Sequence, residues 1–270
     1  MRYAMTVWYL LLSWSVVTFG VVALAADSQP FTAQSGPHTV ALIELYTSEG
    51  CNSCPPADTW LSNLPGRGLT TDRLIPLALH VDYWDNLGWP DRFAQALFTQ
   101  RQRAIAARHR TRTVYTPQVV LQGTDFRDWR GLEQQVQRLN ATTARADLRV
   151  QVTERSPAGL DLHAEAVVPQ ERERSHTQLY VALYENNLRS NVTAGENRGR
   201  TLQHDFVVRQ WLGPVDLDPQ GRAQFQHPLR LEREWKRPDL GVVMFVQNSH
   251  SGEVLQALAL PLAPGQRKGE

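Results

Sequence analysis

Cysteine occurs in this chain only in the tetrapeptide Cys51-Asn52-Ser53-Cys54, which stands between a predicted strand and a predicted helix. The apolar residues 40–46 precede it with the pattern of a buried strand, and two prolines follow it. Proline suits the first turn of a helix, because the N–H that it lacks has no intrahelical acceptor there. Two thiols at a helix N-terminus can open and close as a disulfide, and the positive end of the helix dipole favours the thiolate. The pair is therefore the strongest functional indication in the chain.

Two other interpretations of the pair stay open at this level. A disulfide that closes a four-residue loop removes little entropy from the unfolded chain, so a purely structural disulfide here would stabilise weakly. The thiolates could instead bind copper or zinc with His80, although the chain has no second pair of cysteines. The alternatives to a redox dithiol are thus a metal carrier using Cys51, Cys54 and His80, and a non-catalytic protein-binding module with a permanent disulfide.

The N-terminus has the features of a secretory signal peptide over residues 1–26. Arg2 precedes a mostly apolar stretch, and Ala23-Leu24-Ala25 forms an A-x-A cleavage site, which places cleavage near Ala25 or Ala26. An uncleaved anchor is the alternative, but small and polar residues interrupt the apolar run (Ser13, Ser15, Thr18 and Gly20). We expect a periplasmic or secreted protein with no membrane segment after cleavage, in a compartment where disulfides persist.

Charge argues against two classes of partner. The chain has 28 Lys and Arg against 27 Asp and Glu, so bulk electrostatics do not favour nucleic acid or a membrane surface. The sequence contains no glycine-rich phosphate loop or nucleotide fingerprint, and we expect no cofactor. The expected partners are protein or small-molecule thiols and disulfides.

The predicted elements divide the mature chain into two parts. A polar leader at 27–37, expected to be loosely ordered, precedes residues 38–143. There, strands (40–46, 74–81, 119–121, and an edge segment at 126–129) alternate with helices (55–64, 91–109, 132–141), which predicts an α/β layer fold. Residues 147–263 contain short strands separated by turn signals, including a run at 202–211, which predicts a β-sandwich. A polar tail at 264–270 ends the chain.

A proline opens the predicted strand at 119–121. Thr116-Pro117 must lie where no ladder N–H is needed, and such a bond can be cis. A strand, a CxxC, a helix and a later X-Pro at a strand start follow one another in the thioredoxin fold, which this part of the chain resembles. The resemblance implies that Pro117 packs against the dithiol with Thr116 beside the sulfurs, in a loop that presents backbone groups to a bound peptide.

Longer matching stretches of sequence narrow the resemblance from the thioredoxin fold to one family. The string Gly-Cys-x-Ser-Cys-Pro-Pro-Ala-Asp lies within residues 47–58, and further matching strings follow at 80–85, 87–89, 101–103, 114–118, 195–197, 199–200 and 204–209. Together they resemble a secreted thioredoxin-like family, the domain of unknown function 1223 group, over nearly the whole mature chain. The resemblance implies the fold but supplies no substrate.

The chemistry of thiol–disulfide exchange predicts a role for each ionisable residue near the dithiol. We expect Cys51 to be the more exposed sulfur and the attacking thiolate, and Cys54, deeper in the helix, to resolve the mixed disulfide. Glu44 lies in an otherwise apolar strand, where burial would favour its protonated form and make it a candidate proton acceptor for Cys54. A solvated strand end is the alternative for Glu44. Glu49, two residues before Cys51, would oppose thiolate formation.

Aromatic residues flank the predicted site. Trp84 and Trp89 follow the second strand, at the end where open α/β sheets bind ligands. With Tyr115, they are candidates for a peptide-binding surface, and a core between the two parts is the alternative for the tryptophans. The nearby His80 is either a metal ligand or a hydrogen-bonded structural residue.

A polar loop in the second part, residues 197–205, mixes Asn, Arg and His. Such a loop could contact a partner, or it could dock onto the first part and bring Arg200 or His204 near the dithiol. We favour docking.

Overall fold

The structure is a computed structural model that describes Met1, residues 29–111 and residues 113–263. The predicted signal peptide beyond Met1, the start of the leader and the tail at 264–270 lie outside the described residues. In chain order the elements are β1 (Phe31–Gln34), β2 (Ala41–Thr47), α1 (Pro55–Ser62), β3 (Leu74–His80), α2 (Ala96–Arg108), β4 (Gln118–Leu121), β5 (Thr124–Asp125), α3 (Leu132–Asn140), β6 (Asp147–Ser156), β7 (Gly159–Val167), β8 (Thr177–Glu185), β9 (Leu188–Asn191), β10 (Thr201–His204), β11 (Val207–Asp216), β12 (Arg222–Arg230), β13 (Leu240–Asn248) and β14 (Val254–Pro261).

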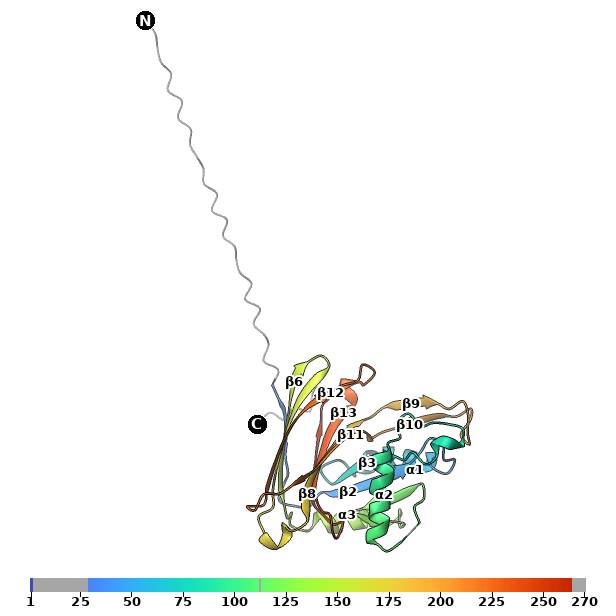
Figure 1. Cartoon of the computed structure of the whole chain (residues 1–270), viewed down its shortest axis with the longest axis horizontal. Coiled ribbons are helices and arrows are strands. Elements are labelled where there is room, and N and C mark those ends of the chain that lie inside the picture. The colour runs from blue at the N-terminus through green and yellow to red at the C-terminus, as the bar shows by residue number, and fades with distance from the viewer. Residues whose placement is uncertain (2–28, 112, 264–270) are drawn as a thin grey trace.

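One large sheet joins the two predicted parts of the chain. Its eight strands have the order β14-β13-β8-β11-β3-β2-β4-β5, so strands from both halves lie in one hydrogen-bonded layer. The junction is the parallel pairing of β11 with β3, where the Ala78 N–H donates to the Phe206 carbonyl at 2.8 Å. A second sheet has the order β1-β6-β7-β12, and β9 and β10 form a separate hairpin that lies beside α1 (Figure 1).

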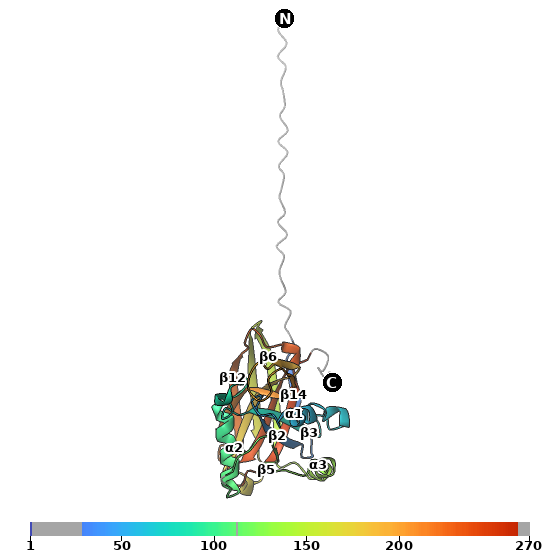
Figure 2. The same cartoon turned by 90° about the vertical axis from the view of Figure 1, so that its right-hand side faces the viewer.

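The eight-stranded sheet lies between two hydrophobic cores. Odd-numbered residues of β8, such as Val181, face the four-stranded sheet, and even-numbered ones, such as Ala182, belong to the core with α1, α2 and α3. This alternation is the period of two that a strand imposes on its side chains. Figure 1 shows the four-stranded sheet on one side of the molecule and the helices on the other, and Figure 2 turns the helical side toward the viewer. The coarse prediction of an α/β part and a β part is therefore confirmed.

Three local predictions are wrong. Residues 31–34, expected in a loosely ordered leader, form β1, because they pair with β6. The predicted edge segment at 126–129 is a loop, and its Trp129 stacks on Trp60 of α1 with ring centroids 4.6 Å apart. The run at 202–211 is two strands, because Phe206 has a φ of 59° and interrupts the extended backbone.

The helix predicted to begin at Asp91 begins at Ala96 instead. The reason lies in the Asp91 carboxylate, which accepts the backbone N–H groups of Glu49 and Phe93 at 2.8 and 2.9 Å. These bonds hold the start of the segment in a turn and bring it against the loop that precedes the cysteines.

Candidate redox site at the Cys51–Cys54 disulfide

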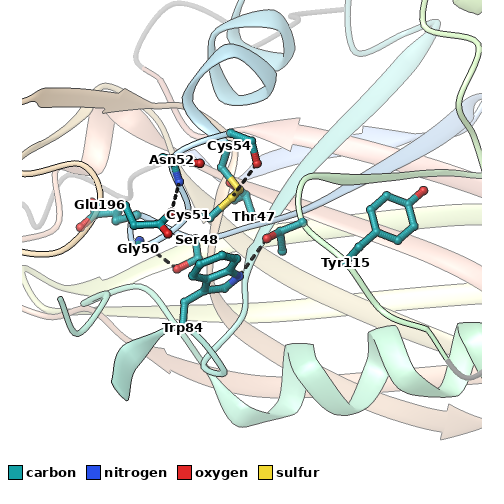
Figure 3. The surroundings of a disulfide bond; sticks show 12 residues. Thr47, Ser48, Gly50, Cys51, Asn52, Cys54, Trp84, Tyr115 and Glu196 are labelled. Carbon is teal, nitrogen blue, oxygen red and sulfur yellow. Dashed lines mark hydrogen bonds between the residues drawn. A yellow bond between two sulfur atoms is a disulfide. The ribbon is translucent and has the colours of Figure 1, made fainter. Parts of the chain in front are cut away.

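Cys51 and Cys54 are joined by a disulfide in the turn between β2 and α1 (Figure 3). Cys54 is the N-cap residue of α1 with helical backbone angles (φ −79°, ψ −37°), and its carbonyl accepts the N–H of Asp58 at 3.1 Å. Pro55 is the first residue of the helix, as its missing N–H allows. Cys51 therefore precedes the helix, and Cys54 lies at its start rather than deeper within it.

The two cysteines do not differ in exposure as expected. Cys51 is 1% exposed and Cys54 is 0% exposed, so the prediction of an accessible Cys51 is wrong for this conformation. The cover comes from chain segments far away in sequence, which no local pattern around the cysteines reveals.

Part of the cover is the loop between β9 and β10. The side-chain amide of Asn197 donates to the carbonyls of Glu49 and Cys51 at 2.8 and 2.9 Å. The Glu196 carboxylate accepts the Asn52 N–H at 3.1 Å, a bond that is visible in Figure 3. We call the hairpin of β9, β10 and their loop, residues 188–204, the cap. It docks onto the first part of the chain as the sequence analysis favoured.

A glycine allows the cap to approach closely. Gly195 has a φ of +70°, and a Cβ there would lie 3.1 Å from the Cβ of Trp89. A side chain at this position would meet both backbone strain and crowding. The Trp89 indole N–H donates to the Glu49 carboxylate at 2.8 Å, so this tryptophan holds the loop before Cys51.

The predicted proline loop lies next to the same site. The Thr116–Pro117 peptide bond is cis. The Trp84 indole N–H donates to the Thr116 hydroxyl at 2.9 Å. Figure 3 shows Trp84 beside the disulfide. Trp84 is half-buried and packs against the core of the helical part. The structure thus brings together Cys51, Cys54, Trp84 and Thr116.

Tyr115 is directed away from the sulfurs (Figure 3). Its hydroxyl donates to the Asp125 carboxylate at 2.7 Å. It lines a cavity of about 370 Å³ whose other lining residues are Thr113, Pro117, Val119, Phe126, Arg127 and Trp129. Trp84 and Trp89 do not line this cavity, so the three aromatic candidates do not share one cavity.

Glu44 is buried, and its carboxylate is fully engaged. It is 1% exposed, which rules out the solvated strand end. Arg101 donates to both of its oxygens at 2.7 and 2.8 Å, and the Tyr46 hydroxyl donates at 2.8 Å. Burial disfavours a charged Arg101, but the charge and hydrogen bonds of Glu44, together with Tyr46 and Tyr180, outweigh burial and raise the pKa of the guanidinium. The surroundings of Glu44 are those of a structural ion pair.

A buried polar cluster lies beside the cysteines, and sequence reasoning recognised only part of it. Its members are Glu49, Asp58, His80, Asp91 and His204, each less than one-tenth exposed. His204 Nε2 lies 3.2 Å from a Glu49 carboxylate oxygen, and His204 Nδ1 lies 3.7 Å from Asp58 Oδ2. His80 Nδ1 lies 2.6 Å from Asp91 Oδ2. The spacing of Asp58, one helical turn after Cys54, was the available signal that the two residues lie on one face of α1.

The cluster shifts the proton affinities of its members in opposite directions. Burial is the largest single influence on Glu49 and on Asp91 and would raise both pKa values. Several hydrogen bonds and charges together outweigh it and hold both values below the ordinary range, led by the His204 hydrogen bond at Glu49 and by the His80 charge at Asp91. Burial would lower the pKa of His80, but the charge and hydrogen bond of Asp91, together with the charges of Asp58 and Glu49, outweigh burial and raise the value. At Asp58 burial prevails over His204 and His80, and the pKa is raised.

The alternative metal site is not formed in this structure. The sulfurs of Cys51 and Cys54 are bonded to each other, and His80 pairs with Asp91. Within the described ranges, no three His, Cys, Asp or Glu side chains are arranged to hold a metal ion.

Comparison with known proteins places the chain in a family. The model of the family described as a protein of unknown function, DUF1223, matches residues 42–247. The chain belongs to the DUF1223 family. This confirms the resemblance found in the sequence, which therefore extends through both halves of this DUF1223 protein.

Solved structures share the fold of this DUF1223 protein. Protein AGR_C_4864 from Agrobacterium tumefaciens has a TM-score of 0.60 at 22% identity, over 87% of this chain and 100% of that one. HBP35 of Porphyromonas gingivalis has a TM-score of 0.63 at 13% identity, over 87% of this chain and 80% of that one. A search of curated proteins finds no match. Among the described residues, every helix is too short or too polar to cross a bilayer.

Proposed function

We propose that this DUF1223 protein is an exported thioredoxin-like protein that performs thiol–disulfide exchange through Cys51 and Cys54. One observation carries the proposal: the two cysteines form a disulfide at the N-terminus of α1, beside the Trp84–Thr116 contact that leads into the cis Pro117 loop. A thiolate that forms at a helix N-terminus is stabilised by the helix dipole. The sequence of the N-terminal 26 residues supports export to an oxidising compartment.

Reduction of the Cys51–Cys54 disulfide takes two exchange steps. A thiolate of a partner dithiol attacks the Cys51 sulfur, the Cys51–Cys54 bond breaks, and Cys54 leaves as a thiolate. The second partner thiolate then attacks the partner sulfur of the mixed disulfide and releases Cys51. The partner gives up two electrons and becomes a disulfide, and two protons end on Cys51 and Cys54. With an oxidised partner the same steps run in reverse.

Burial of the sulfurs sets a condition on this chemistry. Since both cysteines are buried, a partner thiolate reaches Cys51 only after its cover has moved. The Asn197 and Glu196 bonds are what the cap contributes to that cover. Such bonds are individually worth about 1 kcal/mol, so a cap that opens transiently is compatible with exchange.

The same burial favours a second candidate function, a non-catalytic protein-binding module whose disulfide stays closed. In that case the Cys51–Cys54 disulfide would fix the turn between β2 and α1, and the partner protein would bind elsewhere on the surface. The two candidates differ in whether the disulfide reacts while the protein is folded.

Reduction of the folded mature protein separates the candidates. We expect millimolar dithiothreitol to reduce Cys51–Cys54 under native conditions, as seen by mass-resolved thiol labelling, and the protein to accelerate insulin reduction. The variant Cys51→Ser should no longer accelerate insulin reduction. The variant Cys54→Ser should trap a mixed disulfide between Cys51 and its substrate. The double variant C51S/C54S, checked by thermal unfolding, controls for loss of fold. Labelling that appears only when the protein unfolds would support the closed module instead.

A further inference from the structure

Three atoms of the buried cluster lack a hydrogen-bond partner among the described residues. They are Asp58 Oδ2, His80 Nε2 and His204 Nδ1. Buried polar atoms without partners are uncommon, and each costs about 1–3 kcal/mol. Three such atoms in one cluster beside a disulfide call for a functional explanation.

The other polar atom of each side chain is held in place. Asp58 Oδ1 accepts the Thr47 hydroxyl at 2.8 Å, His80 Nδ1 pairs with Asp91, and His204 Nε2 pairs with Glu49. The bonded atoms fix how each side chain is oriented. Of the remaining atoms, Asp58 Oδ2 and His204 Nδ1 face each other at 3.7 Å, which is too far for a hydrogen bond. The two imidazole rings lie edge to face with centroids 5.0 Å apart.

Asp58 is the member of the cluster that is best placed to serve the disulfide. Cys54 has helical backbone angles, and its carbonyl accepts the Asp58 N–H. Side chains four residues apart in a helix lie on one face, with Cβ atoms about 5–6 Å apart. Glu44, the carboxylate proposed from the sequence, is instead saturated by Arg101 and Tyr46.

We propose that Asp58 exchanges a proton with Cys54 during disulfide exchange and that Thr47 and His204 position Asp58 for this step. The inference rests on the proposed function. When a partner thiolate breaks the Cys51–Cys54 bond, the Cys54 thiolate takes the proton of the Asp58 carboxyl group. Asp58 becomes a carboxylate and regains a proton from water. In the oxidising direction, the Asp58 carboxylate accepts the proton of the Cys54 thiol.

Electrostatics agree with this division of roles. The groups that face Asp58 come from four other segments: Thr47 from β2, His80 from β3, Asp91 before α2, and His204 from β10, with Glu49 bound to His204. Burial raises the pKa of Asp58, whereas Glu49 and Asp91 have lowered values. Asp58 is thus the carboxyl group of the cluster that holds a proton most readily.

The test is the pH profile of disulfide reduction in the full mature protein. The second-order rate constant for reduction by dithiothreitol is measured from pH 4 to 9 and divided by the fraction of dithiothreitol present as thiolate. A proton donor must be protonated to act, so the wild-type normalised rate should fall as pH rises through the pKa of Asp58. Asp58→Asn should give a flat profile, about a hundredfold lower at the acidic end, within the range of general acid catalysis.

Two more variants make the result decisive. Thr47→Val removes a hydrogen bond that lowers the pKa of Asp58, so the fall should persist but move to higher pH. His163→Gln, on β7 of the other sheet, is the matched control and should leave the profile unchanged. Circular dichroism verifies the fold of each variant, and Thr47→Val keeps the test valid if Asp58→Asn misfolds.

The outcomes separate the two proposals. If dithiothreitol does not reduce the folded wild-type protein at any pH, the proposed function is overturned. If reduction occurs but the normalised wild-type profile is flat, or Asp58→Asn and Thr47→Val both match the wild type, the role of Asp58 is overturned while thiol–disulfide exchange stands.

Discussion

The side-chain amide of Asn197 donates to the Cys51 carbonyl at 2.9 Å, across 146 residues of sequence. The same amide donates to the Glu49 carbonyl at 2.8 Å, so one buried side chain of the cap holds both ends of the turn that enters the disulfide. This relationship couples the second half of the chain to the chemistry of the first. Under the proposed exchange, the position of the cap determines how readily a partner thiolate reaches the sulfurs.

Loosening the cap should therefore speed reduction. Asn197→Ala removes two buried hydrogen bonds of about 1 kcal/mol each, and each 1.4 kcal/mol corresponds to about a factor of ten in an equilibrium. We expect reduction by dithiothreitol to be about thirty times faster, measured by timed thiol trapping. Asn191→Ala, in β9 of the same hairpin, removes only an exposed bond with Thr201 and should react like the wild type. Equal rates for both variants would show that the cap does not limit access.

The buried pair of Glu44 and Arg101 should govern stability rather than redox chemistry. Removing one partner of a buried ion pair leaves an uncompensated charge and costs about 3–5 kcal/mol. We expect Arg101→Met to lose stability on this scale in urea unfolding. Arg67→Met breaks the exposed pair with Glu133 and should cost less than about 1 kcal/mol. If Glu44→Gln folds yet alters the pH profile of disulfide reduction, our assignment of Glu44 to structure is wrong.

The pair of His80 and Asp91 should give stability a defined pH window. The raised pKa of His80 means that its contribution is complete below the unfolded value of about 6.5 and is lost as pH rises through the folded value. The lowered pKa of Asp91 means that its contribution is complete above about 3.9 and is lost as pH falls through the folded value. The pair therefore stabilises most between about pH 4 and 6.5.

His80→Asn tests this window. Asparagine can keep a hydrogen bond to Asp91 without the charge of the imidazolium. The difference in free energy of unfolding between wild type and variant should be largest inside the window and should shrink toward pH 9 and toward pH 3. A difference that stays constant across pH would mean that His80 is not charged in the folded protein.

Local sequence signals predicted the elements that carry the cysteines. Strand β2, helix α1 with its Pro55 start, and strand β3 agree closely with expectation, because each depends on nearby residues alone. The burial of Glu44 was also foreseen as one option, since a carboxylate inside an apolar strand is conspicuous. Its partner Arg101, 57 residues away, was not.

The missed features depend on contacts between distant segments. Strand β1 has only four residues, and it is a strand because β6 pairs with it more than 100 residues later. Docking of the loop at 197–205 near the dithiol was predicted, but the bond from Asn197 to the Cys51 carbonyl and the contact of His204 with Asp58 were not. Neither residue carries a local pattern that specifies its partner.

The most direct test of the central claim is the reduction potential of the Cys51–Cys54 couple in the folded mature protein, measured by thiol trapping in dithiothreitol buffers of defined ratio. We predict reversible reduction with a potential above about −300 mV, since structural disulfides of secreted proteins lie below that value. A lower potential, or reduction that accompanies only global unfolding, would contradict thiol–disulfide exchange as the function of this site.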